Sequence, residues 1–214
     1  MNLQAALRLY VIPDRGIGAP RTLLEQTGLA LAGGATAIQL RDKELAGREL
    51  LAVGAAMAEL CRQAKALFIV NDRLDIALLC GAHGVHLGQD DLPATEARQL
   101  CPPGFIMGIS AQSGAQAVAA KTHGADYLGI GAVYPTPTKD LSALGLDDVR
   151  RVAATTDLPS VAIGGINLTN AAQVMDCGVN GLAVISAIVG QPDISGSAAK
   201  FLEVINSSLA GATS

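Results

Sequence analysis

The feature that most constrains the fold of this chain is a regular alternation of short apolar runs and longer helical segments. Continuous apolar runs between helices predict buried strands of a parallel sheet that is covered by helices. Eight such units predict a closed (β/α)8 barrel, with a doubly wound open sheet as the alternative. The predicted strands are Leu9–Ile12, Ala37–Leu40, Leu67–Val70, Gly84–Leu87, Phe105–Ile109, Tyr127–Gly131, Ser160–Ile163 and Gly181–Ile185.

The segments between these runs carry apolar residues at helical spacing. The predicted helices are Pro20–Ala32, Leu45–Ala64, a segment that ends at Cys80, Ala94–Leu100, Ala111–Thr122, Leu146–Ala154, Leu168–Cys177 and about Gly196–Leu209. No G-x-G-x-x-G motif follows the first run, so the dinucleotide-binding signature of many doubly wound sheets is missing. We therefore predict one barrel domain over residues 1–214.

Composition limits the partners of this chain. The net charge is −4 and the pI is about 5.3, so a surface for nucleic acid is not expected. The 4 cysteines form no C-x-x-C motif, which argues against zinc and a disulfide framework and fits a reducing cytosol. Since no signal-peptide pattern or membrane-spanning apolar run is present, we expect a cytoplasmic protein without a membrane partner.

Polar and ionisable residues cluster after the predicted strands. In a (β/α)8 barrel the active site lies at the carboxyl ends of the strands. The residues at these ends are Gln39, Arg41, Lys43, Asn71, Asp72, Gln89, Asp90, Asp91, Ser110, Thr136, Thr138, Lys139, Gly164, Gly165, Ile185 and Ser186. The opposite ends carry mainly Gly-Ala and Gly-Val pairs. This asymmetry predicts a catalytic site at one mouth of the barrel.

The Gln-Leu-Arg-Asp-Lys stretch at the end of the second strand predicts a site for a charged oxyanion. Because side chains of a strand alternate between two faces, Gln39, Arg41 and Lys43 are expected on one side. An amide, a guanidinium and an ammonium group together suit an anion such as diphosphate. The alternative is a solvated strand end in which Arg41 forms a salt bridge.

Two carboxylates are predicted to meet at a metal ion. Asp72 and Asp91 follow the third and fourth strands, which should be neighbours about 4.8 Å apart. Carboxylates without a nearby Cys suit Mg2+, which binds through one or two of them plus phosphate oxygens. Asp90 competes with Asp91 for this role, and Asp72 could cap the following helix, either as its whole role or in addition to binding the ion.

A second anion site is expected after the seventh and eighth strands. Gly164 and Gly165 allow the backbone to approach an anion closely, and Ser186 follows the last strand. Barrels of this kind often bind a phosphate at this position, on loop amides and a helix N-terminus. A simple tight turn is the alternative.

The loop Pro135–Lys139 lies between these two predicted sites and carries two threonine hydroxyls and a lysine. Two phosphate sites at one mouth suggest an enzyme that joins two phosphorylated molecules. No Ser-His-Asp set or Cys-His pair stands out. We therefore expect Mg2+ and cations to stabilise a departing diphosphate while an alkyl group moves to a nucleophile.

Four further residues are interpreted from their positions in the predicted strands. If both lie in the fourth strand, His83 and His86 are on opposite faces, and we interpret both as structural, with His86 hydrogen-bonded inside the barrel. Tyr10 is either a core residue or a stacking partner for a ring. Asp126 begins the sixth strand, away from the active mouth, and is interpreted as structural.

Motifs along nearly the whole chain resemble those of the thiamine phosphate synthase family. In chain order they are LYVIPD, QLRDK, FIVNDRLDIAL, GVHLGQDD, DYLGIGAVYPTPTK, VAIGGI and VISAI. The resemblance implies a (β/α)8 transferase that joins a hydroxymethylpyrimidine diphosphate to a thiazole phosphate, giving thiamine phosphate and diphosphate. It also implies a dissociative reaction, in which diphosphate leaves first and no protein nucleophile is required.

The resemblance also implies the roles of individual residues. For the pyrimidine diphosphate these are Gln39, Arg41, Lys43, Asn71, Ser110 and Lys139, of which Arg41, Lys43, Ser110 and Lys139 would be catalytic. For one Mg2+ ion they are Asp72 and Asp91, and for the thiazole phosphate Thr136, Thr138, Gly165, Ile185 and Ser186. Thr136 and Thr138 would then face the thiazole phosphate and Lys139 the departing diphosphate. Pro13 departs from the family, which usually has Thr or Ser there, so Asp14 receives no role.

Two other functions are alternatives. A thiazole tautomerase on the same barrel would need neither Mg2+ nor a cationic diphosphate site. A non-catalytic sensor of thiamine precursors would not need a complete catalytic site. The presence of Arg41, Lys43, Asp72, Asp91 and Lys139 favours the synthase over both. The oligomeric state is left open by the sequence, with a homo-oligomer among the options.

Overall fold

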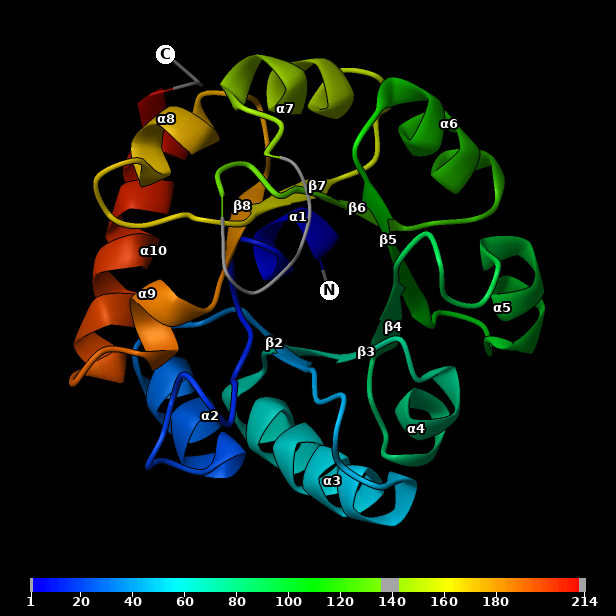
Figure 1. Ribbon diagram of the computed structural model, residues 1–214, viewed down its shortest axis with the longest axis vertical. Helices are drawn as coiled ribbons and strands as arrows, with labels where there is room; N and C mark the ends of the chain where they lie inside the picture. The colour runs from blue at the N-terminus through cyan, green and yellow to red at the C-terminus, as the bar shows by residue number, and fades with distance from the viewer. Residues whose placement is uncertain (1, 136–142, 212–214) are drawn as a thin grey trace.

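The computed structural model describes residues 2–135 and 143–211 and shows a closed barrel of eight parallel strands, as predicted. The strands follow one another in chain order, and the last pairs with the first. They form an inner ring surrounded by helices (Figure 1). The strands are β1 (Leu9–Val11), β2 (Ala37–Leu40), β3 (Leu67–Asn71), β4 (Gly84–Leu87), β5 (Ile106–Ala111), β6 (Tyr127–Gly131), β7 (Ser160–Ile163) and β8 (Gly181–Val184).

The helices of the described ranges differ from the predicted ones mainly at their starts. They are α1 (Leu3–Ala6), α2 (Leu23–Ala32), α3 (Gly47–Ala64), α4 (Leu74–Leu79), α5 (Ala94–Leu100), α6 (Gly114–Thr122), α7 (Leu146–Ala153), α8 (Ala171–Met175), α9 (Ser186–Val189) and α10 (Ile194–Gly211). The short helices α1 and α9 were not predicted, because one turn is too short to show a helical period.

Capping explains why α2 starts three residues after the predicted Pro20. The side chain of Thr22 accepts a hydrogen bond from the backbone N–H of Glu25, and the carboxylate of Glu25 accepts one from the N–H of Thr22. This reciprocal capping box satisfies two N–H groups at the helix start. In the same way, the side chain of Ser113 caps α6, so the predicted start at Ala111 is wrong.

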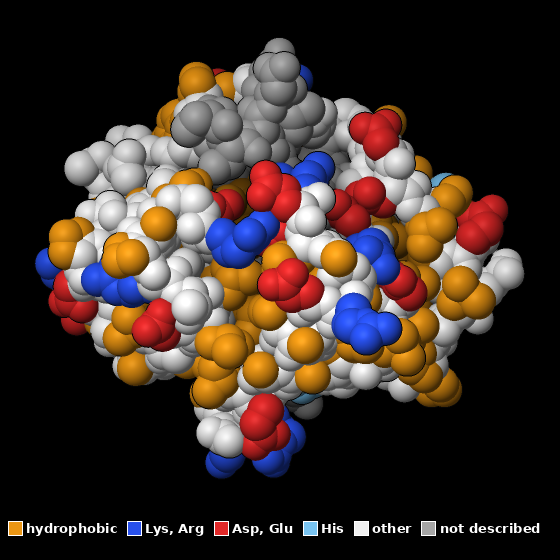
Figure 2. Space-filling view, turned by 60° about the horizontal axis from the view of Figure 1, so that its bottom comes forward, with side chains coloured by type: hydrophobic (Ala, Val, Ile, Leu, Met, Phe, Trp, Pro, Cys, Tyr) orange, Lys and Arg blue, Asp and Glu red, His pale blue; other side chains and the backbone are white. Residues whose placement is uncertain are grey.

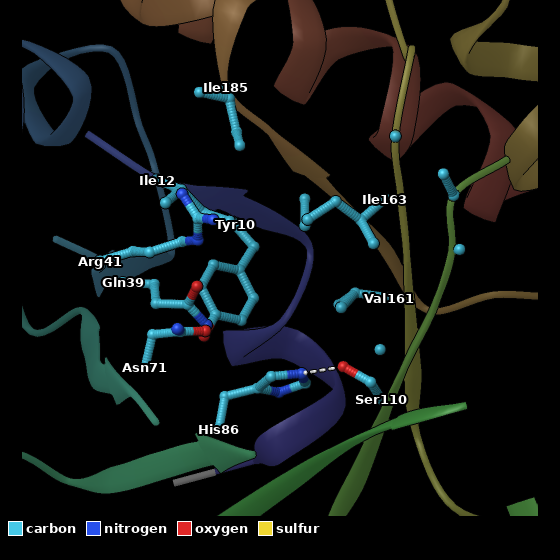
Figure 3. A pocket seen from close by; sticks show the side chains of 15 residues that line it. Tyr10, Ile12, Gln39, Arg41, Asn71, His86, Ser110, Val161, Ile163 and Ile185 are labelled. Carbon is cyan, nitrogen blue, oxygen red and sulfur yellow. Dashed lines mark hydrogen bonds between the residues drawn. The ribbon is translucent and has the colours of Figure 1, made fainter. Parts of the chain in front are cut away.

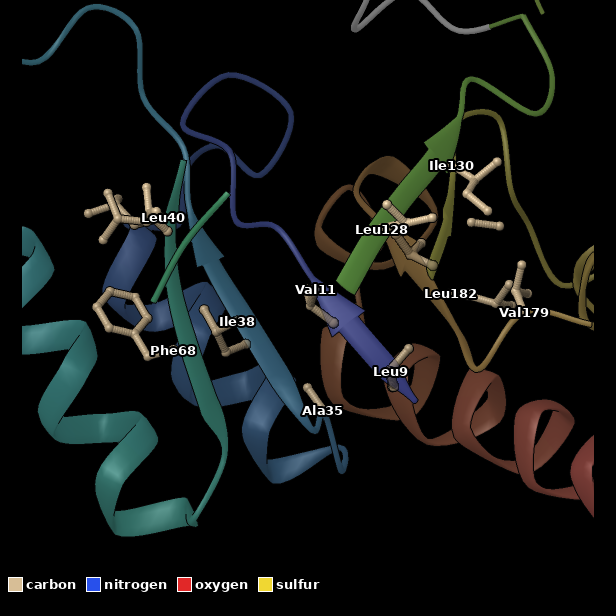
Figure 4. Packing of buried hydrophobic residues seen from close by; sticks show 14 of the residues in the cluster. Leu9, Val11, Ala35, Ile38, Leu40, Phe68, Leu128, Ile130, Val179 and Leu182 are labelled. Atoms are coloured by element: carbon tan, nitrogen blue, oxygen red, sulfur yellow. The ribbon is translucent and has the colours of Figure 1, made fainter. Parts of the chain in front are cut away.

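Side chains along the strands alternate between two hydrophobic clusters. In β1, Leu9 and Val11 belong to the cluster between the barrel and its helices, whereas Tyr10 belongs to the cluster inside the barrel. Figure 4 shows the outer cluster, in which strand residues such as Ile38 and Phe68 pack beneath the helices. The inner cluster fills the barrel, so the mouth at the carboxyl ends of the strands lies above a packed core.

Helix α1 covers the amino-terminal mouth of the barrel, and an ion pair joins α5 to the start of β6. Helix α1 is seen through the centre of the ring in Figure 1, and Ala6 at its end belongs to the inner cluster. Just before β6, Oδ2 of Asp126 accepts hydrogen bonds from Arg98 Nη2 at 2.6 Å and from the N–H of Met107 at 2.7 Å. These contacts confirm the structural interpretation of Asp126.

The distribution of charged side chains on the surface agrees with the small net charge of the protein. On the face shown in Figure 2, acidic and basic side chains are interspersed with one another and with apolar ones. In the part of the chain that the structure describes, no helix is long and apolar enough to cross a membrane.

Candidate active site

A cavity lies among the carboxyl-terminal parts of the strands (Figure 3). It holds about 650 Å³, part of it open to solvent. One wall is polar and the opposite wall is apolar, with Val161, Ile163 and Ile185 on the apolar side. The polar wall consists of side chains from β1 to β5 and the segment after β2, namely Tyr10, Gln39, Arg41, Asn71, His86 and Ser110. A flat ring with polar edge atoms fits such a space.

A chain of hydrogen bonds links five of the polar side chains inside the barrel. Nε2 of Gln39 donates to the hydroxyl of Tyr10 at 2.9 Å, and the hydroxyls of Tyr10 and Tyr127 are 3.1 Å apart. The Tyr127 hydroxyl lies 3.0 Å from Nδ1 of His86, whose Nε2 lies 3.0 Å from Oγ of Ser110. The prediction that His86 is hydrogen-bonded inside the barrel is therefore confirmed.

Two glycines make room for the rings of Tyr127 and His86 in this hydrogen-bonded chain. A Cβ at Gly108 would lie 2.1 Å from the ring of Tyr127, and a Cβ at Gly129 would lie 2.8 Å from Cε1 of His86. Only glycine leaves these positions free for an aromatic ring. The Gly-spaced pattern of β6 therefore serves the packing of side chains inside the barrel.

Both phenols of the hydrogen-bonded chain are buried, with Tyr10 1% and Tyr127 0% exposed. Burial raises the pKa of each, because the phenolate would lose its hydration. Both hydroxyls therefore stay protonated at neutral pH and act as hydrogen-bonding groups. Tyr10 also lines the cavity, so it is both a core residue and part of the site wall.

An acidic cleft continues from the cavity. The two share Arg41, Asn71 and Ser110 in their linings, and the cleft adds Lys43, Asp72, Gln89, Asp90 and Asp91. Gln39 and Arg41 therefore line the cavity, and Arg41 and Lys43 line the cleft, on the side that strand alternation predicts. Asp42 instead forms a salt bridge with Arg15, in which Arg15 Nε lies 2.5 Å from Asp42 Oδ2. The alternative of a salt-bridged Arg41 is not met among the described residues, where the ion pair next to it joins Arg15 to Asp42.

The carboxyl groups of Asp72 and Asp91 are in direct contact in this cleft. Burial, and then the hydrogen bond to Asp91, raise the pKa of Asp72 to about 6, although Lys43 and Arg41 act in the opposite direction. Asp91 Oδ2 is held by the N–H of Gly88 at 2.6 Å. Asp72 does not cap α4, whose N-cap residue is Arg73, so that alternative is wrong.

This pair of carboxylates fits a divalent cation. Placing two carboxylates in contact costs free energy because their charges repel. A cation that binds between their oxygens removes this repulsion. The described residues contain no group of three His, Cys, Asp or Glu side chains that could hold a metal. Two carboxylates suit Mg2+, which completes its coordination with waters and phosphate oxygens.

A third hollow lies beside the ends of β7 and β8. Gly164 and Gly165 have φ angles of 106° and 65°, which disfavour other residues. A Cβ at Gly165 would also lie 2.6 Å from Cβ of Tyr134. Ile185 and Ser186 line the same hollow, and Ser186 begins α9. Thus Gly165, Ile185 and Ser186 lie together, whereas Thr136, Thr138 and Lys139 lie outside the described residues.

Sequence reasoning missed the role of Tyr127 and left that of Tyr10 open. The positions of the tyrosines were an available signal for their role inside the barrel. The protein has only 3 tyrosines, and two of them stand at inward positions of predicted strands. Their partners were not predictable, because the residues that bond each other are far apart in the sequence.

Comparisons with known proteins agree on one family. A family model described as thiamine monophosphate synthase matches residues 9–188. A protein of Coprothermobacter proteolyticus named thiamine-phosphate synthase is 52% identical over 205 residues, covering 95% of this chain and 97% of that protein. One of Moorella thermoacetica with the same name is 49% identical over 199 residues, covering 92% and 95%.

This chain belongs to the thiamine monophosphate synthase family.

A solved structure of the family, thiamine phosphate pyrophosphorylase from Pyrococcus furiosus, superposes with a TM-score of 0.91 at 42% identity, covering 97% of this chain and 100% of that one. Family membership and the barrel fold predicted from the motifs are thus confirmed. So is the enzyme class, a transferase of thiamine biosynthesis.

Proposed function

We propose that the protein joins a hydroxymethylpyrimidine diphosphate to a thiazole phosphate, giving thiamine phosphate and diphosphate. The observation that carries this proposal is the continuity of a ring-sized cavity with a cleft that holds cations and paired carboxylates. This arrangement suits a ring bearing a diphosphate, with the bond to be broken at the junction. Family membership supports the same reaction.

The aminopyrimidine ring would occupy the cavity. Gln39 offers a hydrogen-bonding group to its polar edge, while Val161 and Ile163 offer an apolar face. The apolar wall would also keep water from the reactive carbon, so that the methylene cation is captured by the thiazole nitrogen.

The diphosphate would occupy the cleft. Arg41, Lys43 and Lys139 would balance its charge, and Asn71 would orient it. Asp72 and Asp91 would hold one Mg2+ ion, which neutralises negative charge on the diphosphate when bound. No protein nucleophile is required, because the electron-rich aminopyrimidine stabilises the cation. The four catalytic residues, Arg41, Lys43, Ser110 and Lys139, would stabilise charge that develops on the leaving oxygens.

The thiazole phosphate would occupy the hollow beside β7 and β8. Its oxygens would accept hydrogen bonds from backbone amides around Gly165 and Ser186, with Ile185 against the ring. Thr136 and Thr138 would add their hydroxyls. The hollow shares Ile163, Gly164 and Ile185 with the cavity, so the two substrates would meet across a short distance.

The thiazole tautomerase alternative is disfavoured by the acidic cleft. A tautomerase uses no diphosphate and has no need of contacting carboxylates beside Arg41 and Lys43. The same cleft argues against a sensor that binds precursors without reaction. We also propose a cytoplasmic location, consistent with the four free cysteines, and a homo-oligomer remains a prediction that sedimentation velocity would test.

The test is to incubate the protein with both substrates, with and without Mg2+, and to measure thiamine phosphate and diphosphate. We expect equal amounts of the two products, and only when Mg2+ is present. Absence of product under every metal condition would refute the proposed reaction. Rearrangement of a thiazole phosphate alone would favour the tautomerase.

A further inference from the structure

The hydrogen-bonded chain inside the barrel ends at the junction of the cavity and the acidic cleft. It runs from Gln39 through Tyr10, Tyr127 and His86 to Ser110. Ser110 lines both spaces, and Figure 3 shows its bond to the ring of His86. The chain therefore connects a buried amide to the place where the leaving oxygen of the pyrimidine diphosphate would lie.

The amide of Gln39 gives the chain a direction. Its Nε2 donates to the oxygen of Tyr10, so the hydrogen of Tyr10 is directed to Tyr127. Tyr127 then donates to Nδ1 of His86, which accepts only when it carries no hydrogen. The neutral imidazole has its hydrogen on Nε2 and donates it to Oγ of Ser110.

The reverse order conflicts with the contacts of the described residues. If His86 donated to Tyr127, Tyr127 would donate to Tyr10, which already accepts from Gln39. The hydrogen of Tyr10 would then have no acceptor within this chain. Burial raises the pKa of both phenols, so neither loses a proton to remove the conflict. The order from Gln39 to Ser110 gives the buried phenol and imidazole hydrogens an acceptor and leaves over only the hydroxyl hydrogen of Ser110, which lies at the junction.

We propose that this chain fixes the hydroxyl of Ser110 as a hydrogen-bond donor to the oxygen that leaves with the diphosphate. The proposal rests on the proposed function. Ser110 already accepts from His86, so its own hydrogen is directed into the junction. The hydrogen stays on Ser110 while the carbon–oxygen bond of the substrate breaks and both electrons leave on the oxygen. A donor oriented before binding stabilises that charge without reorganisation.

Tyr10, Tyr127 and His86 are positioning residues in this scheme, because they act through Ser110. The first test needs no variant and no substrate. The protein has 3 histidines, so 15N-labelled histidine gives few signals in long-range 1H–15N spectra. At pH 8 we expect His86 as the neutral tautomer with its hydrogen on Nε2. A hydrogen on Nδ1, or on both nitrogens, would overturn the proposal.

The second test is a double-mutant cycle on kcat with Tyr127→Phe and Ser110→Ala. We expect Tyr127→Phe alone to reduce kcat by about 10-fold or more, since removal of one oriented donor in other enzymes costs about 10²–10³-fold. In the Ser110→Ala background the same change should cost less than about 2-fold, because the residue it orients is gone. Equal losses in both backgrounds would overturn the proposal.

A matched control is Thr27→Val, which removes a buried hydroxyl that donates to Leu23 within α2. Its kcat should equal that of the wild type. If the wild type made no thiamine phosphate, the proposed function would fail, and the histidine spectra would still decide the direction of the chain.

Discussion

The imidazole ring of His86 lies over Gly129, where a Cβ would come within 2.8 Å of Cε1 and 3.1 Å of Nε2. Both ring nitrogens are hydrogen-bonded, at 3.0 Å to Tyr127 and 3.0 Å to Ser110. The ring therefore cannot move away without lengthening one of these bonds. The geometry of the site therefore requires glycine at position 129, although glycine has no side chain that could take part in the reaction.

We predict that Gly129→Ala reduces kcat by about 10²-fold, the cost expected of a displacement of about 1 Å at a reacting centre. The control is Gly28→Ala in α2, where a Cβ meets no atom within 4 Å. That change should keep full activity and raise the free energy of unfolding by about 0.5–1 kcal/mol. Steady-state kinetics and urea unfolding measure both, and an active Gly129→Ala variant would contradict the packing argument.

The contact of Asp72 with Asp91 predicts a pH-dependent stability without metal. The pKa of Asp72 is about 6 in the folded protein, above its ordinary 3.8, so the folded state binds the proton more tightly than the unfolded state. Stability then falls as pH rises between these values and stays lowered above them. Asp72→Asn should raise Tm at pH 7.5 by a few degrees, at about 2–4 °C per kcal/mol, and have little effect at pH 3.5.

Thermal unfolding in EDTA at both pH values checks this prediction, with Asp90→Asn as the exposed control. Adding Mg2+ at pH 7.5 should stabilise the wild type much more than Asp72→Asn, because the ion needs the carboxylate. A larger effect of Asp72→Asn at pH 3.5 than at pH 7.5 would reverse the sign that we derive.

The choice between Asp90 and Asp91 can be tested by metal affinity. Asp91 contacts Asp72 and is held by Gly88, whereas the side chain of Asp90 is exposed. Asp91→Asn should weaken Mg2+ binding by about 10-fold or more, and Asp90→Asn by less than about 2-fold, since only the first removes a ligand of the pair. Activity titrated with Mg2+ gives both values, and a reversed order would assign the ion to Asp90.

Lys139 is predicted to be essential for turnover. Lys139→Ala should lose most of kcat, by about 10²-fold or more, because one cation that stabilises the leaving diphosphate is removed. The circular dichroism spectrum and Tm should match those of the wild type. Lys200→Ala in α10 is a suitable control for loss of one lysine. Unchanged turnover would remove Lys139 from the mechanism.

Much of the fold was predictable from the sequence because it depends on local periods. Apolar runs such as Leu67–Val70 are strands in the structure, and Asn71 extends that strand by one residue. The alternation within Gln39–Lys43 also predicted which side chains line the cavity and the cleft. Helix starts were less predictable, since a cap such as Thr22 takes precedence over the apolar spacing.

The sequence by itself determined the barrel, the mouth that carries the polar residues and the acidic and basic groups available there. Each of these depends on the order of residues along one strand or loop. Only the tertiary structure decided that Tyr10 bonds Tyr127, 117 residues away, and that Tyr127 bonds His86, 41 residues away. Such contacts arise from closure of the barrel, which brings inward-facing side chains of non-adjacent strands together, and no local pattern encodes that distance.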